Sequence, residues 1–169
     1  MHRASLVLST LAGIARPLAT LSQSRPAVHQ DLTNEDLVGS WRLTIVEANG
    51  STSQALATIG ADGTMVTAEH PVVTPPVADG PIFASSGHGA WRATGPGTAV
   101  CSFVGLGCDG SGAFIGTVTI RAEVALNPGG ETFGGEFAAT IADPAGTTMG
   151  VIPGTIRAMR IAAEAPARS

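Results

Sequence analysis

The sequence predicts an all-β domain that folds as an eight-stranded antiparallel up-and-down barrel. From about Ser40 almost to the end of the chain, apolar and polar residues alternate with a period of two. Short turns rich in Gly, Asn and Asp separate these segments, and no helical segment lies between them. Strands of this kind close most economically into a barrel, which leaves no unpaired edge. A β-sandwich is the alternative.

The composition indicates one domain with a core of small side chains. The chain has 169 residues, of which 44% are hydrophobic but only 4% aromatic, together with 22 glycines. One domain is the default at this length. Because large rings are scarce, we expect the interior of the barrel to remain partly unfilled.

Charge and residue types exclude several classes of function. The net charge is −4 and only 13% of residues are charged, which does not suit nucleic-acid binding. All 9 basic residues other than histidine are arginines, and Tyr is absent. Schiff-base lysines, a phosphate-binding P-loop lysine and a tyrosine general acid are therefore excluded. We expect neither a cofactor nor a metal.

The two cysteines are predicted to be free thiols. Cys101 and Cys108 fall in one expected strand, where an extended chain separates them by about 20 Å. A disulfide needs Cα atoms within about 7 Å, so a bridge would require a tight bend at Gly105 or Gly107. Their spacing does not match a metal site.

The first thirty residues stand apart from the rest of the chain. His2 and Arg3 precede an apolar run, Ala4–Ala15, which resembles a secretory signal and is too short to span a bilayer. A loose N-terminal extension is the alternative. Export to the periplasm or the medium is slightly favoured over a cytoplasmic location. We place the folded domain at residues 31–162 and a flexible tail at 163–169.

The elements then follow in order. In "DLTNEDLVGSW", Thr33 and Asp36 have the spacing of a capping box, which predicts a short helical turn before the first strand. Residues 71–87 form one long Pro-rich irregular segment, and the sequence leaves open whether it is a lid. The eight predicted strands are Ser40–Ala48, Ser53–Ile59, Thr64–His70, His88–Thr94, Thr98–Leu106, Ala113–Leu126, Glu131–Ala142 and Thr147–Ile161.

The dry faces of these strands are predicted to enclose an apolar cavity that holds a small molecule. An eight-stranded barrel has an interior just wide enough to be filled or to hold one ligand. Small residues recur along the strands and leave room there. The predicted ligand contacts are Leu43, Ile45, Phe114, Val118, Ile120, Phe133 and Phe137.

Four titratable residues are candidates for catalysis if the protein is an enzyme. Glu47 shares the parity of the apolar first-strand residues, so it is either a carboxylate at the far end of the cavity wall or a solvated strand end. Glu69 and His70 are adjacent, so only one is expected to face inward. His88 lies where the Pro-rich segment meets the next strand. A fold of that segment over the barrel mouth would bring Glu69 or His70 together with Asp79 and His88.

Two similar stretches, "GSWRLT" at residues 39–44 and "GAWRAT" at 89–94, contain Trp41 and Trp91. A shared rule for starting a strand explains them, and duplication of a half-barrel is the alternative. The helical turn followed by Gly39, Ser40 and Trp41 resembles the start of calycins, the lipocalin-like barrels.

In that superfamily the Trp packs across one end of the barrel and an Arg of the last strand lies against it. The resemblance implies a structural role for Trp41, with Arg157 or Arg160 of "TIRAMRI" as its partner by cation–π packing. The chain is also similar to uncharacterised bacterial lipocalin-like proteins with the order "GSWR … GHGAWR … GTIR".

Two functions follow from these expectations. The first is binding of a small hydrophobic molecule in the lumen. The alternative is a cofactor-free isomerase or cyclase that acts on an apolar substrate held there. A well-packed barrel that works through its outer face is a third hypothesis. The identity of the ligand and the presence of a homodimer stay open.

Overall fold

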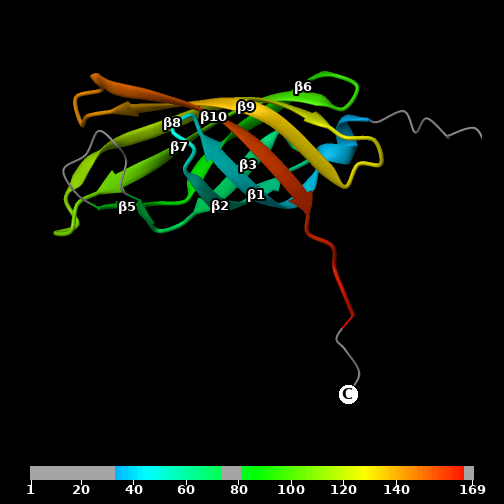
Figure 1. Ribbon diagram of the computed structural model, residues 1–169, viewed down its shortest axis with the longest axis horizontal. Coiled ribbons are helices and arrows are strands. Elements are labelled where there is room, and N and C mark those ends of the chain that lie inside the picture. Colours follow the sequence, from blue (N-terminus) through cyan, green and yellow to red (C-terminus); the bar gives the residue numbers. More distant parts are fainter. Residues whose placement is uncertain (1–32, 74–80, 166–169) are drawn as a thin grey trace, which may run out of the picture.

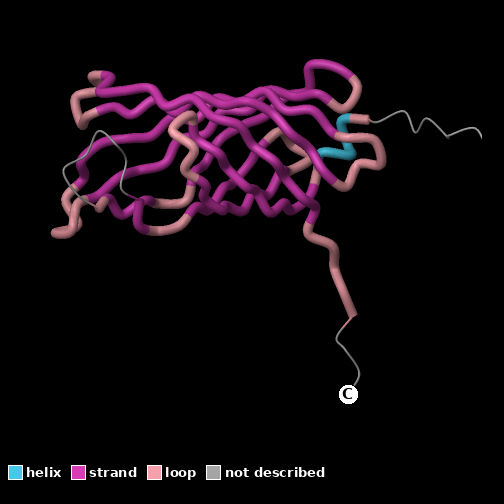
Figure 2. The backbone as a smooth tube through the Cα atoms, viewed as in Figure 1, coloured by secondary structure: helices cyan, strands magenta, loops and turns pink. Residues whose placement is uncertain are grey.

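The computed structural model describes residues 33–73 and 81–165, and these form a closed antiparallel β-barrel (Figures 1 and 2). The predicted fold class is confirmed, and the β-sandwich alternative is wrong. A 3₁₀ helix, η1 (Asn34–Leu37), precedes the first strand. The eight barrel strands are β1 (Gly39–Glu47), β2 (Thr52–Ile59), β3 (Thr64–Glu69), β6 (Gly87–Gly95), β7 (Thr98–Cys108), β8 (Phe114–Leu126), β9 (Thr132–Ala142) and β10 (Thr148–Arg160).

The barrel is a meander that closes on itself. Each barrel strand pairs with the next one in the chain, and the last strand, β10, returns to pair with β1. In this closing pair Trp41 lies opposite Arg160 and Glu47 lies opposite Gly154. Closure satisfies the backbone groups that an open sheet would expose at its edges.

Two short strands within the Pro-rich segment escaped the sequence prediction. These are β4 (Val72–Val73) and β5 (Ile82–Ala84), which pair with each other. β5 also pairs with Cys108 and Gly107 of β7, beyond the part of β7 that pairs with β6. The two strands therefore lengthen the barrel wall at one end. Residues 74–80, including Asp79, lie outside the described residues.

The two ends of the barrel differ in character. Figure 1 shows η1 at one end and β5 at the other. The end with η1 also carries the turn between β8 and β9, and we call it the Trp41 end. The opposite end, where β1 finishes and β4 and β5 extend the wall, is called the Glu47 end.

The core is built from small side chains and one large ring. Trp41 and Leu37 are the largest fully buried residues, and they lie together at the Trp41 end. Trp41 meets Phe133 edge to face, with ring centroids 4.8 Å apart. Much of the remaining buried wall consists of alanines, namely Ala55, Ala57, Ala99, Ala122, Ala139 and Ala158. Side chains of this size line a barrel without filling it.

The capping box predicted for the helical turn is confirmed. The backbone N–H and the hydroxyl of Thr33 both donate to Oδ2 of Asp36, at 2.6 Å and 3.1 Å. The Asp36 N–H donates to the Thr33 carbonyl at 3.2 Å, which is the backbone bond of the 3₁₀ turn. This turn places Leu37 over the end of the barrel. The carbonyl of Leu37 then accepts a hydrogen bond from Nε1 of Trp41 at 3.0 Å.

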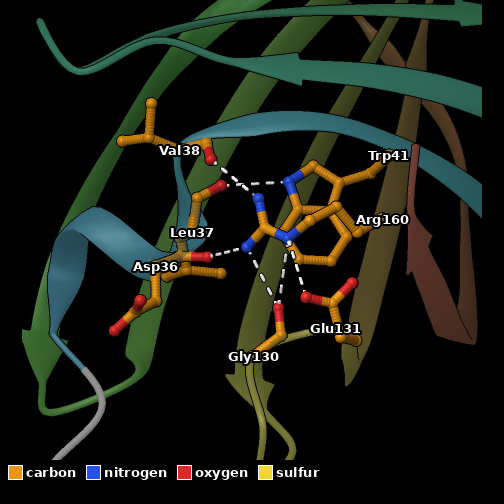
Figure 3. A network of polar contacts seen from close by, with 7 residues as sticks. All are labelled: Asp36, Leu37, Val38, Trp41, Gly130, Glu131 and Arg160. Atoms are coloured by element: carbon orange, nitrogen blue, oxygen red, sulfur yellow. Dashed lines mark hydrogen bonds and ion pairs between the residues drawn. The ribbon is translucent and has the colours of Figure 1, made fainter. Parts of the chain in front are cut away.

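Arg160 ties this end of the barrel together (Figure 3). Its guanidinium carbon lies 4.2 Å from the centroid of the Trp41 ring, in a cation–π contact. Its NH1 donates to the carbonyl of Val38 at 3.0 Å, and its NH2 donates to the carbonyls of Asp36 and Gly130. One side chain thus joins η1, β1, β10 and the turn before β9.

Gly39 is required beside this side chain. Its φ is +138°, a conformation that residues with a Cβ rarely adopt, and a Cβ there would lie 2.8 Å from NH1 of Arg160. The glycine before Trp41 therefore lets the chain leave η1 and pass under the guanidinium.

Of the two arginines proposed as the partner of Trp41, the structure selects Arg160, and the expectation for Arg157 is wrong. Arg157 lies opposite Thr44 of β1 and Gly134 of β9, and its side chain is exposed on the outer face. The parity of β10 explains the choice, because the two arginines are three positions apart and their side chains therefore leave opposite faces of the strand.

The two cysteines are free, as predicted. Within residues 33–73 and 81–165, no helix is long and apolar enough to cross a membrane.

We predict that Arg160→Ala destabilises the protein by about 2–4 kcal/mol, because it leaves partly buried carbonyls without donors and removes the contact with Trp41. Arg160→Lys should recover only part of this, since an ammonium cannot reach the three carbonyls as a planar fork. Urea unfolding followed by tryptophan fluorescence measures both effects.

Arg157→Ala is the matched control, with the same change on the same strand but at an exposed position, and it should shift stability by less than about 0.5 kcal/mol. Equal losses at positions 157 and 160 would contradict the role given to Arg160.

Candidate functional site

A cavity of about 630 Å³ occupies the interior of the barrel. It runs from Leu37 and Phe133 at the Trp41 end to Glu47, His70 and Ser85 at the Glu47 end. Its size lies within the range of about 300–1,000 Å³ that is typical of small-molecule sites.

The apolar side chains of the first, sixth and seventh predicted strands form much of the cavity wall. They lie on β1, β8 and β9, and each projects inward because of the period-two alternation. Six of the seven residues expected to contact a ligand line the cavity, namely Leu43, Ile45, Val118, Ile120, Phe133 and Phe137.

Phe114, the seventh expected ligand contact, does not line the cavity, and its side chain is 47% exposed. The register between β7 and β8 shifts at this point, where Cys108 pairs with Phe114 and Gly107 with Gly116. The bulge breaks the alternation, so the parity shared by Phe114 and Val118 no longer implies a shared face.

Two carboxylates enter the cavity at the Glu47 end. Glu47 of β1 lines it, and its Oε2 accepts hydrogen bonds from Oγ of Ser51 at 2.9 Å and Nδ2 of Asn49 at 3.2 Å. Glu69 of β3 lines the same end. Among the described residues, no hydrogen bond or ion pair engages the Glu69 carboxylate.

The environment of Glu69 disfavours its charged form. Partial burial by the cavity walls raises the pKa of Glu69, and repulsion from Glu47 adds to the effect. Water still reaches this side chain from the mouth of the cavity. Glu69 therefore takes up a proton at a higher pH than an ordinary glutamate.

His70 also contributes to the cavity wall, together with Glu69. His70 follows the last residue of β3, and its side chain is exposed at the rim of the cavity. Nδ1 of His70 lies 3.1 Å from the carbonyl of Val72, which holds the ring at the rim.

His88 lies away from this group. It sits within β6, opposite Val66 and Val104, and its side chain is exposed on the outer face of the barrel. Its inward-facing neighbours are Gly87 and Gly89. The expectation that His88 joins Glu69 and His70 at the mouth is wrong, because β6 begins one residue earlier than predicted and fixes the orientation of His88 by alternation.

Sequence reasoning missed one polar side chain in the wall. Thr67 of β3 is 3% exposed and lines the cavity, and its hydroxyl has no hydrogen-bond partner among the described residues. Such a group is unusual, because buried hydroxyls are nearly always paired. The sequence signal that indicates this position is strand alternation, because Thr67 lies two residues from both Met65 and Glu69 and so shares their face of β3.

Cys101 and Trp91 complete the inner wall on β7 and β6. Burial raises the pKa of the Cys101 thiol to about 11, so this cysteine is a poor nucleophile at neutral pH. The Trp91 indole N–H donates to the carbonyl of Gly60 at 2.8 Å. Both tryptophans thus face inward and bond a main-chain carbonyl near the Trp41 end.

The described residues contain no group of three or more His, Cys, Asp and Glu side chains arranged to hold a metal ion. A second hollow, of about 1120 Å³, lies over the outer face of β6 to β9. It is an open surface lined by small and charged side chains and does not enclose a ligand. The interior cavity is therefore the candidate site.

No protein-family model matches this chain. No curated protein matches it either. Among solved structures, the chain is similar to a redesigned beta barrel, with 20% sequence identity and a TM-score of 0.44. That likeness covers 76% of this chain and 94% of the other.

We predict that Glu69→Gln makes the protein more stable near neutral pH and that this gain disappears on acidification. Folding raises the pKa of Glu69, so the ionised carboxylate penalises the folded state above that pKa. Below about pH 4 the carboxyl is neutral in both states and the penalty is absent. Thermal unfolding of both proteins between about pH 4 and 8 measures the difference.

Glu123→Gln, which removes a carboxylate from the outer face of β8, is the control and should show no comparable gain. A Glu69→Gln effect that stays constant over the pH range, or that grows on acidification, would contradict the assigned environment.

Proposed function

We propose that the barrel binds one small hydrophobic molecule inside its lumen. The observation that carries this proposal is the interior cavity of about 630 Å³ with a wall that is largely aliphatic and aromatic. An apolar ligand that buries about 300 Å² there would gain roughly 7 kcal/mol before the costs of association.

A calycin-like assignment of the barrel supports the same proposal. The short turn η1, the Gly39-Ser40-Trp41 start and the Arg160 side chain on the Trp41 ring reproduce the arrangement that the resemblance implies. Together they close one end of the barrel. Entry of a ligand is then expected at the Glu47 end, where the polar residues of the wall gather.

The second candidate function is a cofactor-free isomerase or cyclase. It is favoured by the two carboxylates in a largely apolar cavity, since one of them, Glu69, has a raised pKa. A neutral Glu69 could donate a proton to a bound substrate, while Glu47, held by Ser51 and Asn49, could accept one. In this reading the apolar wall holds the substrate in its reactive conformation.

We predict that the purified chain binds one equivalent of the neutral probe N-phenyl-1-naphthylamine with enhanced fluorescence. Ala139→Phe, which fills the lumen from β9, should weaken this binding by about tenfold or more, because the ring occupies ligand space. Ala138→Phe places the same ring on the outer face and should leave binding within about twofold. Equal losses in both variants would contradict binding in the lumen.

Protection of Cys101 gives an independent readout that does not depend on the folding of a variant. Because the thiol lines the cavity, bound probe should slow its alkylation at pH about 9. An unchanged rate at saturating probe would place the probe elsewhere. Glu69→Gln then separates the two functions, since it should leave probe binding intact and abolish any turnover.

A further inference from the structure

The outer face of the barrel is uncharged where β7 to β10 approach the Glu47 end. Phe103, Ile120, Ile141 and Ile152, one on each of these strands, line the cavity, so the residues that alternate with them face outward. We call the resulting surface the Thr119 face. It consists of Val104 on β7, Thr117 and Thr119 on β8, Ala138, Thr140 and Ala142 on β9, and Val151 and Pro153 on β10.

The strand register joins these residues into one continuous surface. One row crosses all four strands by direct pairing, and its members are Val104, Thr119, Thr140 and Val151. Further rows of the same face lie on either side of it along the strands. Thr119 and Thr140 therefore lie near the centre of the face.

Several apolar side chains of this surface are open to solvent. Val104 is 41% exposed and Val151 is 57% exposed. Phe114 and Met149, which flank the face near the turns, are 47% and 55% exposed. A contiguous group of exposed apolar side chains marks a surface that meets a partner.

Charged residues border the Thr119 face but do not enter it. Toward the Trp41 end, the next outward residues are Arg121 on β8 and Glu136 on β9. At the other end, Asp109 and Asp143 lie in the turns. An apolar centre with a charged rim is the arrangement of protein–protein interfaces. Lipid is a poorer partner, because the threonine hydroxyls and the bordering carboxylates would lose water without gaining hydrogen bonds.

The area and the charge of this face fit a second copy of the chain. With Phe114 and Met149 it exposes on the order of 600 Å², so two copies would bury about 1,200 Å² in total, the lower limit for a specific interface. A two-fold interface places one patch against itself. A charged patch would then meet like charges, whereas the Thr119 face carries none, and two such sheets can pack about 10 Å apart.

We propose that the Thr119 face binds a second copy of this chain and forms a two-fold symmetric dimer. The two-fold axis passes through the centre of such an interface, so Thr119 of each copy lies close to Thr119 of the other. Since the inward residues of the same strands line the cavity, the dimer leaves both cavities free, and this inference stands apart from the proposed function.

Sedimentation velocity of the full chain between about 1 and 100 µM tests the dimer. The wild type should associate with a dissociation constant in the micromolar range, in keeping with an interface at the lower limit of size. Thr119→Arg and Thr119→Glu should each weaken association by about tenfold or more, because like charges then face each other across the axis. An equimolar mixture of the two variants should associate again, since Arg then faces Glu, and this recovery also shows that both variants are folded.

Thr58→Arg is the matched control. It makes the same substitution on the outer face of β2, four strands from β8 around the barrel, and should leave the dissociation constant within about twofold. A wild type that stays monomeric at 100 µM, a mixture that stays monomeric, or an equal loss in Thr58→Arg overturns the proposal. A monomer that sediments with phosphatidylcholine vesicles would overturn it as well and would identify lipid as the partner.

Discussion

The closure of β10 onto β1 is the constraint on which the rest of the structure depends. At the Trp41 end this closure is fixed by Arg160, which stacks on Trp41 and donates to carbonyls of η1 and of the turn before β9. These contacts seal one end of the barrel with the largest buried side chains. The other end is left to polar residues, so the asymmetry of the cavity follows from the way the barrel closes.

The chemistry of the cavity follows from the alternation of the strands. Once Trp41 faces inward, Leu43, Ile45 and Glu47 must do so as well, and the same rule carries Met65, Thr67 and Glu69 inward on β3. Two carboxylates, Glu47 on β1 and Glu69 on β3, thus enter the lumen at the Glu47 end, and only β2 lies between their strands. Glu47 accepts hydrogen bonds from Ser51 and Asn49, and Glu69 has a raised pKa.

All eight barrel strands and the capped turn could be predicted from the sequence, because alternation and turn residues are local signals. Glu47, Glu69 and His70 could be predicted as cavity candidates by their positions in the strands. Phe114 and His88 could not be placed, since a bulge at Gly107 and the start of β6 depend on pairing with distant strands. The unpaired hydroxyl of Thr67 is a property of the packed interior, which no pattern in the sequence reveals.

A crystal structure of the chain grown with N-phenyl-1-naphthylamine tests binding in the lumen most directly. The proposed function predicts continuous density for one molecule inside the barrel, packed against Phe133 and the other apolar side chains of the wall. Density on the outer face of β6 to β9, or a lumen filled by its own side chains, would contradict it.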